Sequence, residues 1–172
     1  MKLRKKLVPA VMIGMLCMAA SAPACAAETT EFSYLEENEP TYTVSIPASV
    51  QMTKEGSDLT IKASDVAYLD GKKISVTIAG TDGYINQMVM EGDTTSPVYS
   101  SSLRYQILKG DQVIETTGKK NQVVGVELAS FTGNGKETLK VKPVIDGTGR
   151  RVEKGVTYTG TMTYGIDLVD AK

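Results

Sequence analysis

The chain has 172 residues, 19 Lys and Arg against 20 Asp and Glu, two Cys, and neither His nor Trp. Most Ser and Cys nucleophiles use a histidine base, and zinc sites are built from His and Cys, so the composition disfavours both kinds of site. The slightly negative net charge gives no electrostatic reason to bind nucleic acid, because that affinity rests on basic contacts to phosphates.

The first 27 residues have the three parts of a secretory signal peptide. A basic start at residues 2–6 precedes an apolar run at 7–20, and small residues at 24–27 form a cleavage site of the A-x-A type. The apolar run is shorter than the roughly 20 residues of a membrane span. We expect residues 1–27 to be cleaved and the protein to be secreted or cell-surface associated, with no stable membrane insertion afterwards. An uncleaved anchor or a lipid on Cys25 is the alternative.

Cleavage would change both the charge and the cysteine content of the mature protein. It removes four basic residues and both cysteines, which leaves 15 basic and 20 acidic residues and a net charge of −5. A disulfide framework is then excluded although the compartment is oxidising. The remaining chain, about 145 residues long, has the normal size of one domain with its own core.

Residues 28–40 are acidic and show no regular alternation. Such a composition predicts an exposed, flexible lead-in, because glutamate is a poor strand former. In the alternative interpretation, this segment adds itself as a strand to the open sheet edge of a neighbouring copy. Its anchors would then be Phe32, Tyr34 and Leu35.

After Pro40, apolar and polar residues alternate with the period of two that predicts β-strands. In the first such stretch, Pro47 interrupts the row before Val50 and Met52 resume it, which indicates a strand that bends and crosses between two sheets. The stretch 63–71 fits either one helical turn or a short strand. Further strands are predicted at 58–63, 73–80, 84–90, 103–115 (a hairpin), 122–131, 137–146 and 155–169.

These short strands and the glycine-rich turns between them predict an all-β fold. We expect residues 41–172 to form a single antiparallel immunoglobulin-like β-sandwich of about 8–9 strands, with a barrel as the alternative. The row Leu139, Val141 and Ile145 should face the core. In the last strand, Val156, Tyr158, Gly160, Met162, Tyr164, Ile166 and Leu168 should face inward, and the alternating threonines outward.

The sequence offers no catalytic residue set, no cofactor motif and no metal motif. The glycine turns GNGK and GTGRR lack the strand-to-helix context of a phosphate-binding loop. Acidic residues cluster in turns, where their propensity explains them. A calcium ion held by Asp82 with Asp93, or by Asp146 with backbone carbonyls, is the only metal alternative.

The stretches YTVSIPA and YTGTMTY resemble motifs of small secreted proteins of Gram-positive gut bacteria with WxL-like or immunoglobulin-like surface and adhesin modules. This chain has neither the WxL tryptophans nor an LPxTG-like sorting signal. The resemblance implies surface display or extracellular assembly and no catalytic residues. It rests on Tyr42, Thr43, Val44, Ile46, Pro47 and Ala48, and on Tyr158, Thr159, Gly160, Thr161, Thr163 and Tyr164.

Some surface modules of this kind carry a Lys–Asn isopeptide bond in the core. The candidates here are Lys140 or Lys142 with Asn86. Both lysines alternate with Leu139 and Val141, so the strand pattern predicts that they face solvent.

We therefore expect a non-enzymatic module of adhesion or extracellular assembly. Its partners would be surface proteins or glycans, or further copies bound through residues 28–40 or an open sheet edge. Tyr68, Tyr84 and Tyr99 are candidate ligand contacts, because tyrosine suits contact surfaces, although packing also accounts for each. A carbohydrate-binding module is the alternative function, and a glycosidase with two carboxylates across a cleft is a third.

Overall fold

The computed structural model describes residues 31–35, 38–145 and 151–171 of the chain. The predicted signal peptide, its cleavage site and Asp146 lie outside these residues. The chain divides into two units between Glu36 and Glu37. Of the first unit the structure describes residues 31–35, an extended stretch with exposed side chains. None of the described residues belongs to a helix that is long and apolar enough to span a membrane.

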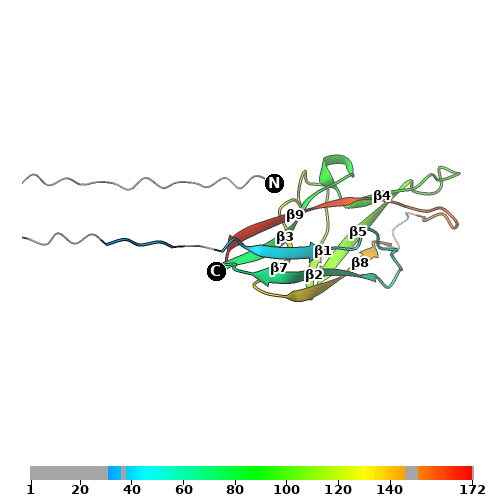
Figure 1. Ribbon diagram of the computed structural model, residues 1–172. Coiled ribbons are helices and arrows are strands. Elements are labelled where there is room, and N and C mark those ends of the chain that lie inside the picture. Colours follow the sequence, from blue (N-terminus) through cyan, green and yellow to red (C-terminus); the bar gives the residue numbers. More distant parts are fainter. Residues whose placement is uncertain (1–30, 36–37, 146–150, 172) are drawn as a thin grey trace, which may run out of the picture. The chain divides into compact units, whose positions relative to one another are not determined.

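The second unit is all-β, with two antiparallel sheets that together contain nine strands among the described residues (Figure 1). This confirms the predicted antiparallel, sandwich-like fold and its number of strands. The larger sheet has the order β1 (Thr41–Ser45), β2 (Ser57–Ala67), β8 (Gly135–Pro143), β5 (Ser102–Lys109) and β4 (Val89–Glu91), with β6 (Gln112–Ile114) on β5. The smaller sheet has the order β7 (Glu127–Phe131), β3 (Lys72–Thr81) and β9 (Met162–Asp170).

The core lies between the inner faces of the two sheets. Alternate residues of a strand point to the same face, so each strand with an alternating pattern contributes one apolar row. The prediction for Leu139 and Val141 is confirmed, since both are buried. The remaining rows include Leu59, Ile61 and Ala63 of β2, Ile74, Val76 and Ile78 of β3, Tyr105 and Ile107 of β5, and Ala129 and Phe131 of β7.

The stretch 63–71, which fitted two interpretations, is mostly strand. β2 continues through it to Ala67, and Asp65 has a φ of 56° where the pairing with β1 shifts register between Thr41 and Thr43. Such a bulge turns the strand end without breaking the sheet. The hairpin at 103–115 is confirmed as β5 and β6.

Two predicted strands are shorter than their patterns. Residues 84–90 contain a 3-10 turn, η1 (Tyr84–Asn86), in which Ile85 has a φ of 53°, so the alternation there was misleading. Strand β4 begins only at Val89. In the stretch 122–131, strand β7 begins at Glu127. Tertiary packing explains the apolar residues outside the strands, because Met88 and Val123 are buried in the core without being strand residues.

The predicted crossing of the first strand between sheets is wrong. β1 ends at Ser45, pairs only with β2, and stays in the larger sheet. Residues 47–52 belong to no strand, and no hydrogen bond between backbone groups joins them to another described residue. Pro47 has no N–H to donate to a ladder, which accounts for the end of pairing at this point.

Three further corrections concern β8 and β9. Ile145 is exposed rather than inward, because β8 ends at Pro143 and the alternation ends with it. The closing strand begins at Met162 and not at residue 155. Within β9, Met162, Tyr164 and Leu168 pack against the core as predicted, but Ile166 is 38% exposed. β9 is an edge strand that pairs only with β3 among the described strands. No second neighbouring strand in that part of the chain therefore shields Ile166.

Candidate binding groove

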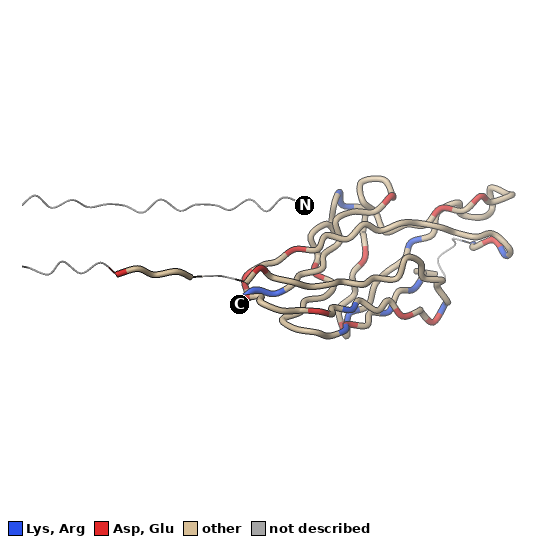
Figure 2. The backbone as a smooth tube through the Cα atoms, viewed as in Figure 1, with Lys and Arg blue, Asp and Glu red and all other residues tan. Residues whose placement is uncertain are grey.

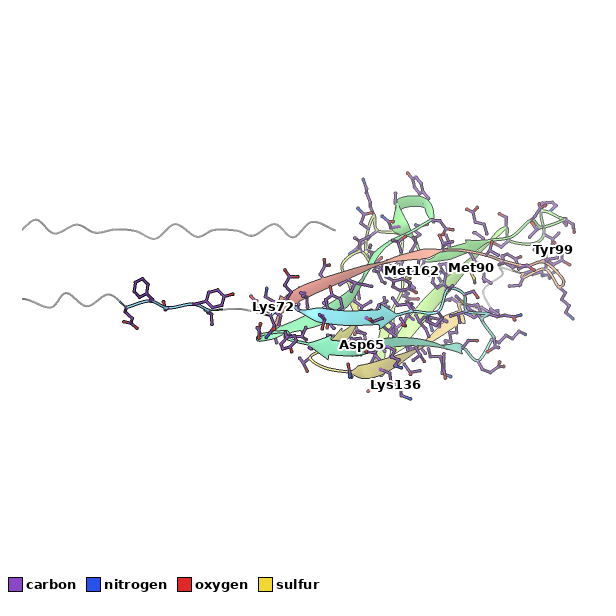
Figure 3. All side chains as sticks on the ribbon, viewed as in Figure 1. Asp65, Lys72, Met90, Tyr99, Lys136 and Met162 are labelled. Carbon is purple, nitrogen blue, oxygen red and sulfur yellow. The ribbon has the colours of Figure 1, made fainter. Side chains whose placement is uncertain are left out.

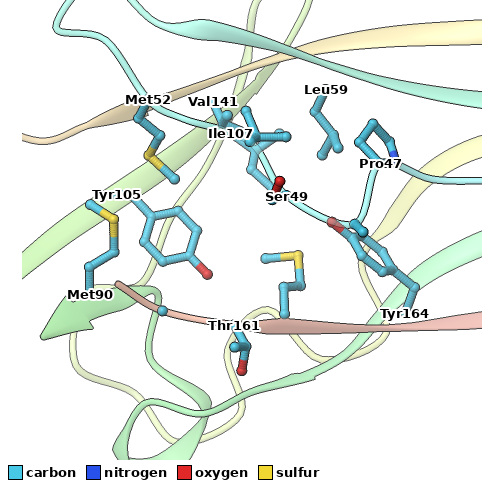
Figure 4. Close-up of a pocket in the computed structure, with 14 residues that line it drawn as sticks. Pro47, Ser49, Met52, Leu59, Met90, Tyr105, Ile107, Val141, Thr161 and Tyr164 are labelled. Atoms are coloured by element: carbon cyan, nitrogen blue, oxygen red, sulfur yellow. The ribbon is translucent and has the colours of Figure 1, made fainter. Parts of the chain in front are cut away.

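A groove opens where residues 47–52 face the start of β9 (Figure 4). Its inner part encloses about 190 Å³. The floor comes from β2, β5 and β8 and from Met90 of β4, all core elements. One wall is the unpaired segment after β1, and the other is formed by residues 158–164. The lining residues are Pro47, Ala48, Ser49, Val50, Met52, Leu59, Met90, Tyr105, Ile107, Val141, Gly160, Thr161, Met162 and Tyr164.

A second hollow of about 620 Å³ continues the groove along residues 156–160. The two share Val50, Met52, Met90 and Gly160, among others, so they form one surface feature. The larger hollow falls within the usual volume range of ligand sites, roughly 300–1,000 Å³, whereas the first part alone is smaller. No lining residue of either part carries a charge. Elsewhere on the folded unit, acidic and basic residues are interspersed (Figure 2).

Within the second wall, residues 158–161 are fixed to the neighbouring segments by specific contacts. The Tyr158 hydroxyl donates to the Ser100 carbonyl at 2.8 Å. Thr159 exchanges backbone hydrogen bonds with Glu91 at 2.8 and 2.9 Å. Gly160 lies so close to β4 that a Cβ there would be 2.7 Å from the Val89 carbonyl oxygen. This wall is therefore tightly placed, although it is not a regular strand.

Thr161, the residue of this wall that precedes β9, is held by two hydrogen bonds to Asp82. Its N–H donates to Asp82 Oδ2 at 3.0 Å, and its carbonyl accepts from the Asp82 N–H at 3.3 Å. Beyond it, β9 pairs with β3 alone among the described strands. The second edge of β9 consequently has no strand partner in the described structure.

The opposite wall has few internal ties. Ser57 Oγ donates to the Gln51 carbonyl at 2.7 Å, and Ser57 Oγ accepts from the Thr53 N–H at 3.1 Å. The backbone groups of residues 47–50 make no hydrogen bond with the described part of the chain. Unpaired backbone groups next to an apolar floor are the usual setting for strand addition by a peptide.

Two tyrosine hydroxyls reach into the groove without a hydrogen-bond partner among the described residues. Tyr105 is only 5% exposed and lines the groove, and Tyr164 is half-buried on β9. Figure 4 shows the Tyr105 hydroxyl turned towards the β9 wall and the Tyr164 ring reaching towards Pro47. Neither hydroxyl makes a hydrogen bond with any described residue. No buried side-chain oxygen or nitrogen of the described residues lacks a partner, so both hydroxyls are open to solvent in the groove, where water or a ligand can bond to them.

Burial also affects the acidity of both groups. It raises the pKa of the Tyr105 hydroxyl well above the usual tyrosine range, with smaller contributions from Asp82 and Tyr164. Burial likewise raises the pKa of Tyr164. Both hydroxyls are thus neutral at physiological pH and can each donate one hydrogen bond and accept others.

The three tyrosines selected from the sequence do not form one surface. Tyr68 lies in the turn that leads to Lys72, and Tyr99 lies at the opposite end of the folded unit (Figure 3). Tyr84 is 81% exposed on η1, whereas Tyr99 is half-buried beside Arg151. Tyr105 and Tyr164 were missed, because their place in regular alternating rows indicated core packing alone. Nothing in that pattern distinguishes a packed hydroxyl from an unpartnered one.

The η1 loop holds Tyr84 in a rigid frame. Asn86 Oδ1 accepts from the Thr81 N–H at 3.0 Å, and Asn86 Nδ2 donates to Asn121 Oδ1 at 2.6 Å. The Asn121 N–H in turn donates to the Ile85 carbonyl at 2.9 Å. These bonds hold Ile85 in the left-handed region, which a β-branched residue rarely adopts. Tyr84 is therefore a single displayed aromatic, without a second one beside it from the predicted set.

The structure also bears on the other candidate sites, the metal site and the isopeptide bond. Among the described residues, no three His, Cys, Asp or Glu side chains are close enough to hold a metal ion. Of the isopeptide candidates, Lys140 Nζ lies 3.9 Å from Asp58, and Asn86 Nδ2 donates to Asn121, so these two side chains have other partners. A hollow of about 240 Å³ contains Asp82 and Glu91, but Asp82 Oδ2 there accepts the Thr161 N–H.

No model of a known protein family matches the chain, and no curated protein matches it.

Proposed function

We propose that the protein is a non-enzymatic extracellular module of surface adhesion or assembly, and that it captures an extended peptide segment in the groove. The observation that carries this proposal is an uncharged floor between two stretches of available backbone: residues 47–50, and the edge of β9 that has no strand partner among the described residues. An added strand would bond to the walls through its backbone and bury alternate side chains on the floor. Secretion rests on the sequence of residues 1–27.

The position of the two motif stretches supports the same proposal. Pro47 and Ala48 of the first stretch belong to one wall, and residues 158–161 and Tyr164 of the second belong to the other side. The Tyr158 hydroxyl bonds to the Ser100 carbonyl, and Gly160 packs closely against β4, so both residues help to position this wall. Part of each stretch that resembles surface and adhesin modules thus lines the groove.

The lining chemistry favours binding over catalysis. It consists of aliphatic residues, methionines, small residues, hydroxyl groups and Gln51, without carboxylate, lysine or arginine. General acid–base work needs a titratable group near the working pH, and the raised pKa values of Tyr105 and Tyr164 move these hydroxyls away from it. A carbohydrate-binding module remains the second proposal, and exposed Tyr84 is the observation that favours it.

Short random peptides displayed on phage, selected on the immobilised protein, test the proposal. We expect the selected peptides to alternate apolar and polar residues and to bind saturably. Ala48→Trp should fill the groove mouth and weaken binding roughly tenfold or more, a loss of about 1.4 kcal/mol. Ala171→Trp, at an exposed site outside the lining, is the matched control. If no peptide binds and a glycan array shows saturable binding that Tyr84→Ala removes, the carbohydrate alternative replaces the proposal.

A further inference from the structure

We infer that the groove takes the segment Phe32–Leu35 of a second copy, so that copies join head to tail. This inference rests on the proposed function and names its partner. The segment is a short uncharged run between Glu31 and Glu36. The groove lining is also uncharged, so the segment can enter it while the flanking glutamates stay in water.

The side chains of this segment are free to bind. Phe32, Tyr34 and Leu35 are 91%, 85% and 80% exposed in the extended stretch that the structure describes. Because these three large side chains are exposed, they do not pack against any described residue. Such a cluster of exposed apolar side chains is typical of a contact surface. In an extended strand Phe32 and Tyr34 point to the same side, about 7 Å apart, and would enter the groove together.

The groove offers what an added strand needs. Residues 47–50 and the second edge of β9 have no strand partner among the described residues. A strand between them would supply backbone partners on both sides. The hydroxyls of Tyr105 and Tyr164, unbonded within the described structure, would find backbone or Ser33 groups of the incoming segment.

Strand register argues against the same chain filling its own groove. Thr41 is already paired with Ala67, so the latest tight hairpin that could fold the segment back has its turn at residues 39 and 40. That turn places Tyr34 opposite Ser45 and Phe32 opposite Pro47, the first residue of the groove. Tyr34 would stay outside it. A second copy has no such restriction, because its segment is not tied to this β1.

Photocrosslinking of the full chain tests the inference. Tyr34→benzoylphenylalanine is introduced, heavy-isotope-labelled and unlabelled copies are mixed, and the cross-linked peptides are identified by mass spectrometry. We expect mixed heavy–light peptides that join residue 34 to residues 47–52 or 156–164. The free peptide of residues 28–40 and the variant Ala48→Trp should each reduce the yield several-fold, whereas Ala171→Trp should not.

Association in solution provides the second readout. Sedimentation should show species larger than a monomer as concentration rises, and Phe32→Ser with Tyr34→Ser should weaken association roughly tenfold. These residues lie outside the folded unit, so the variant tests binding rather than folding.

Cross-links within one copy only, cross-links to another surface, or a monomer at all concentrations would each overturn the inference. If phage-selected peptides still bind the groove in that case, the proposed function survives and only the choice of partner is wrong. If they do not bind either, both fail.

Discussion

β3 and residues 47–52 have similar apolar patterns but opposite surroundings. β3 is paired on both sides, by β7 and β9, and Ile74, Val76 and Ile78 are completely buried. Residues 47–52 have no strand on either side, and Val50 and Met52 remain half-buried at the groove. Alternation therefore predicts which residues turn towards apolar surroundings, but it does not predict whether a backbone partner is present.

The two regions also treat polar groups differently. Ser75 of β3 is buried, and its hydroxyl donates to Glu127 Oε2 at 2.9 Å. Lys73 Nζ lies 3.1 Å from the same oxygen. In the groove, the Tyr105 hydroxyl has no partner in the described chain. The closed side of the sandwich thus satisfies its polar groups internally, whereas the open side leaves hydrogen-bonding capacity for another molecule.

Ile78→Ala and Ile166→Ala give the largest expected contrast between closed and open regions. Ile78 is fully buried, so its truncation should lower the free energy of unfolding by about 2–5 kcal/mol through lost contacts and a cavity. Ile166 on the β9 edge is 38% exposed and should cost clearly less. Chemical denaturation of both variants measures this. Equal losses would mean that the β9 edge is as enclosed as the core.

Tyr158→Phe examines how firmly the groove wall is fixed. The variant removes the hydrogen bond to the Ser100 carbonyl and should lower the free energy of unfolding by about 1 kcal/mol. Chemical denaturation measures this loss, and a titration with a groove-binding peptide should show weaker binding, because the wall would loosen. An unchanged stability would show that the hydroxyl does not hold the wall.

Glu127 gives the closed side a dependence on pH. Burial raises the pKa of Glu127, but hydrogen bonds from Lys73 and Ser75 outweigh burial and bring it below its usual value. A carboxylate with a lowered folded pKa stabilises fully above the unfolded value, about 4.3, and this contribution disappears as pH falls through the folded pKa.

The unfolding free energy should therefore decline in this acidic window, by a small amount because the pair is partly exposed. Glu127→Gln should flatten the decline, and Lys73→Met should do so in part. A pH profile identical to the parent in both variants would contradict the assignment.

Tyr105→Phe should have the smallest effect on folding and a clear effect on binding. Since the hydroxyl has no described partner, its removal should change the unfolding free energy by less than about 0.5 kcal/mol. Binding of a groove peptide should weaken about fivefold, the value of one hydrogen bond. A stability loss as large as that of Tyr158→Phe would show that the hydroxyl serves the fold instead.

The candidate site was predictable only in part from the residues. The two motif stretches were visible in the sequence and form parts of both groove walls, yet they indicated a first and last strand and no groove. The tyrosines chosen for their loops, Tyr68, Tyr84 and Tyr99, lie apart from each other. A tyrosine in a core row, such as Tyr105, shows its unpartnered hydroxyl only when the surrounding side chains are placed.

The sequence by itself determined the all-β class, most strand positions and the inward rows of β2, β3, β5 and β8. The reason is local: side chains alternate along a strand, and glycine, proline and aspartate mark its ends. Tertiary structure decided which edges stay unpaired, that Ile85 belongs to a turn, that Ile145 is exposed and that residues 47–52 form a wall. These features depend on contacts between distant segments, such as Gly160 against β4, which no local pattern contains.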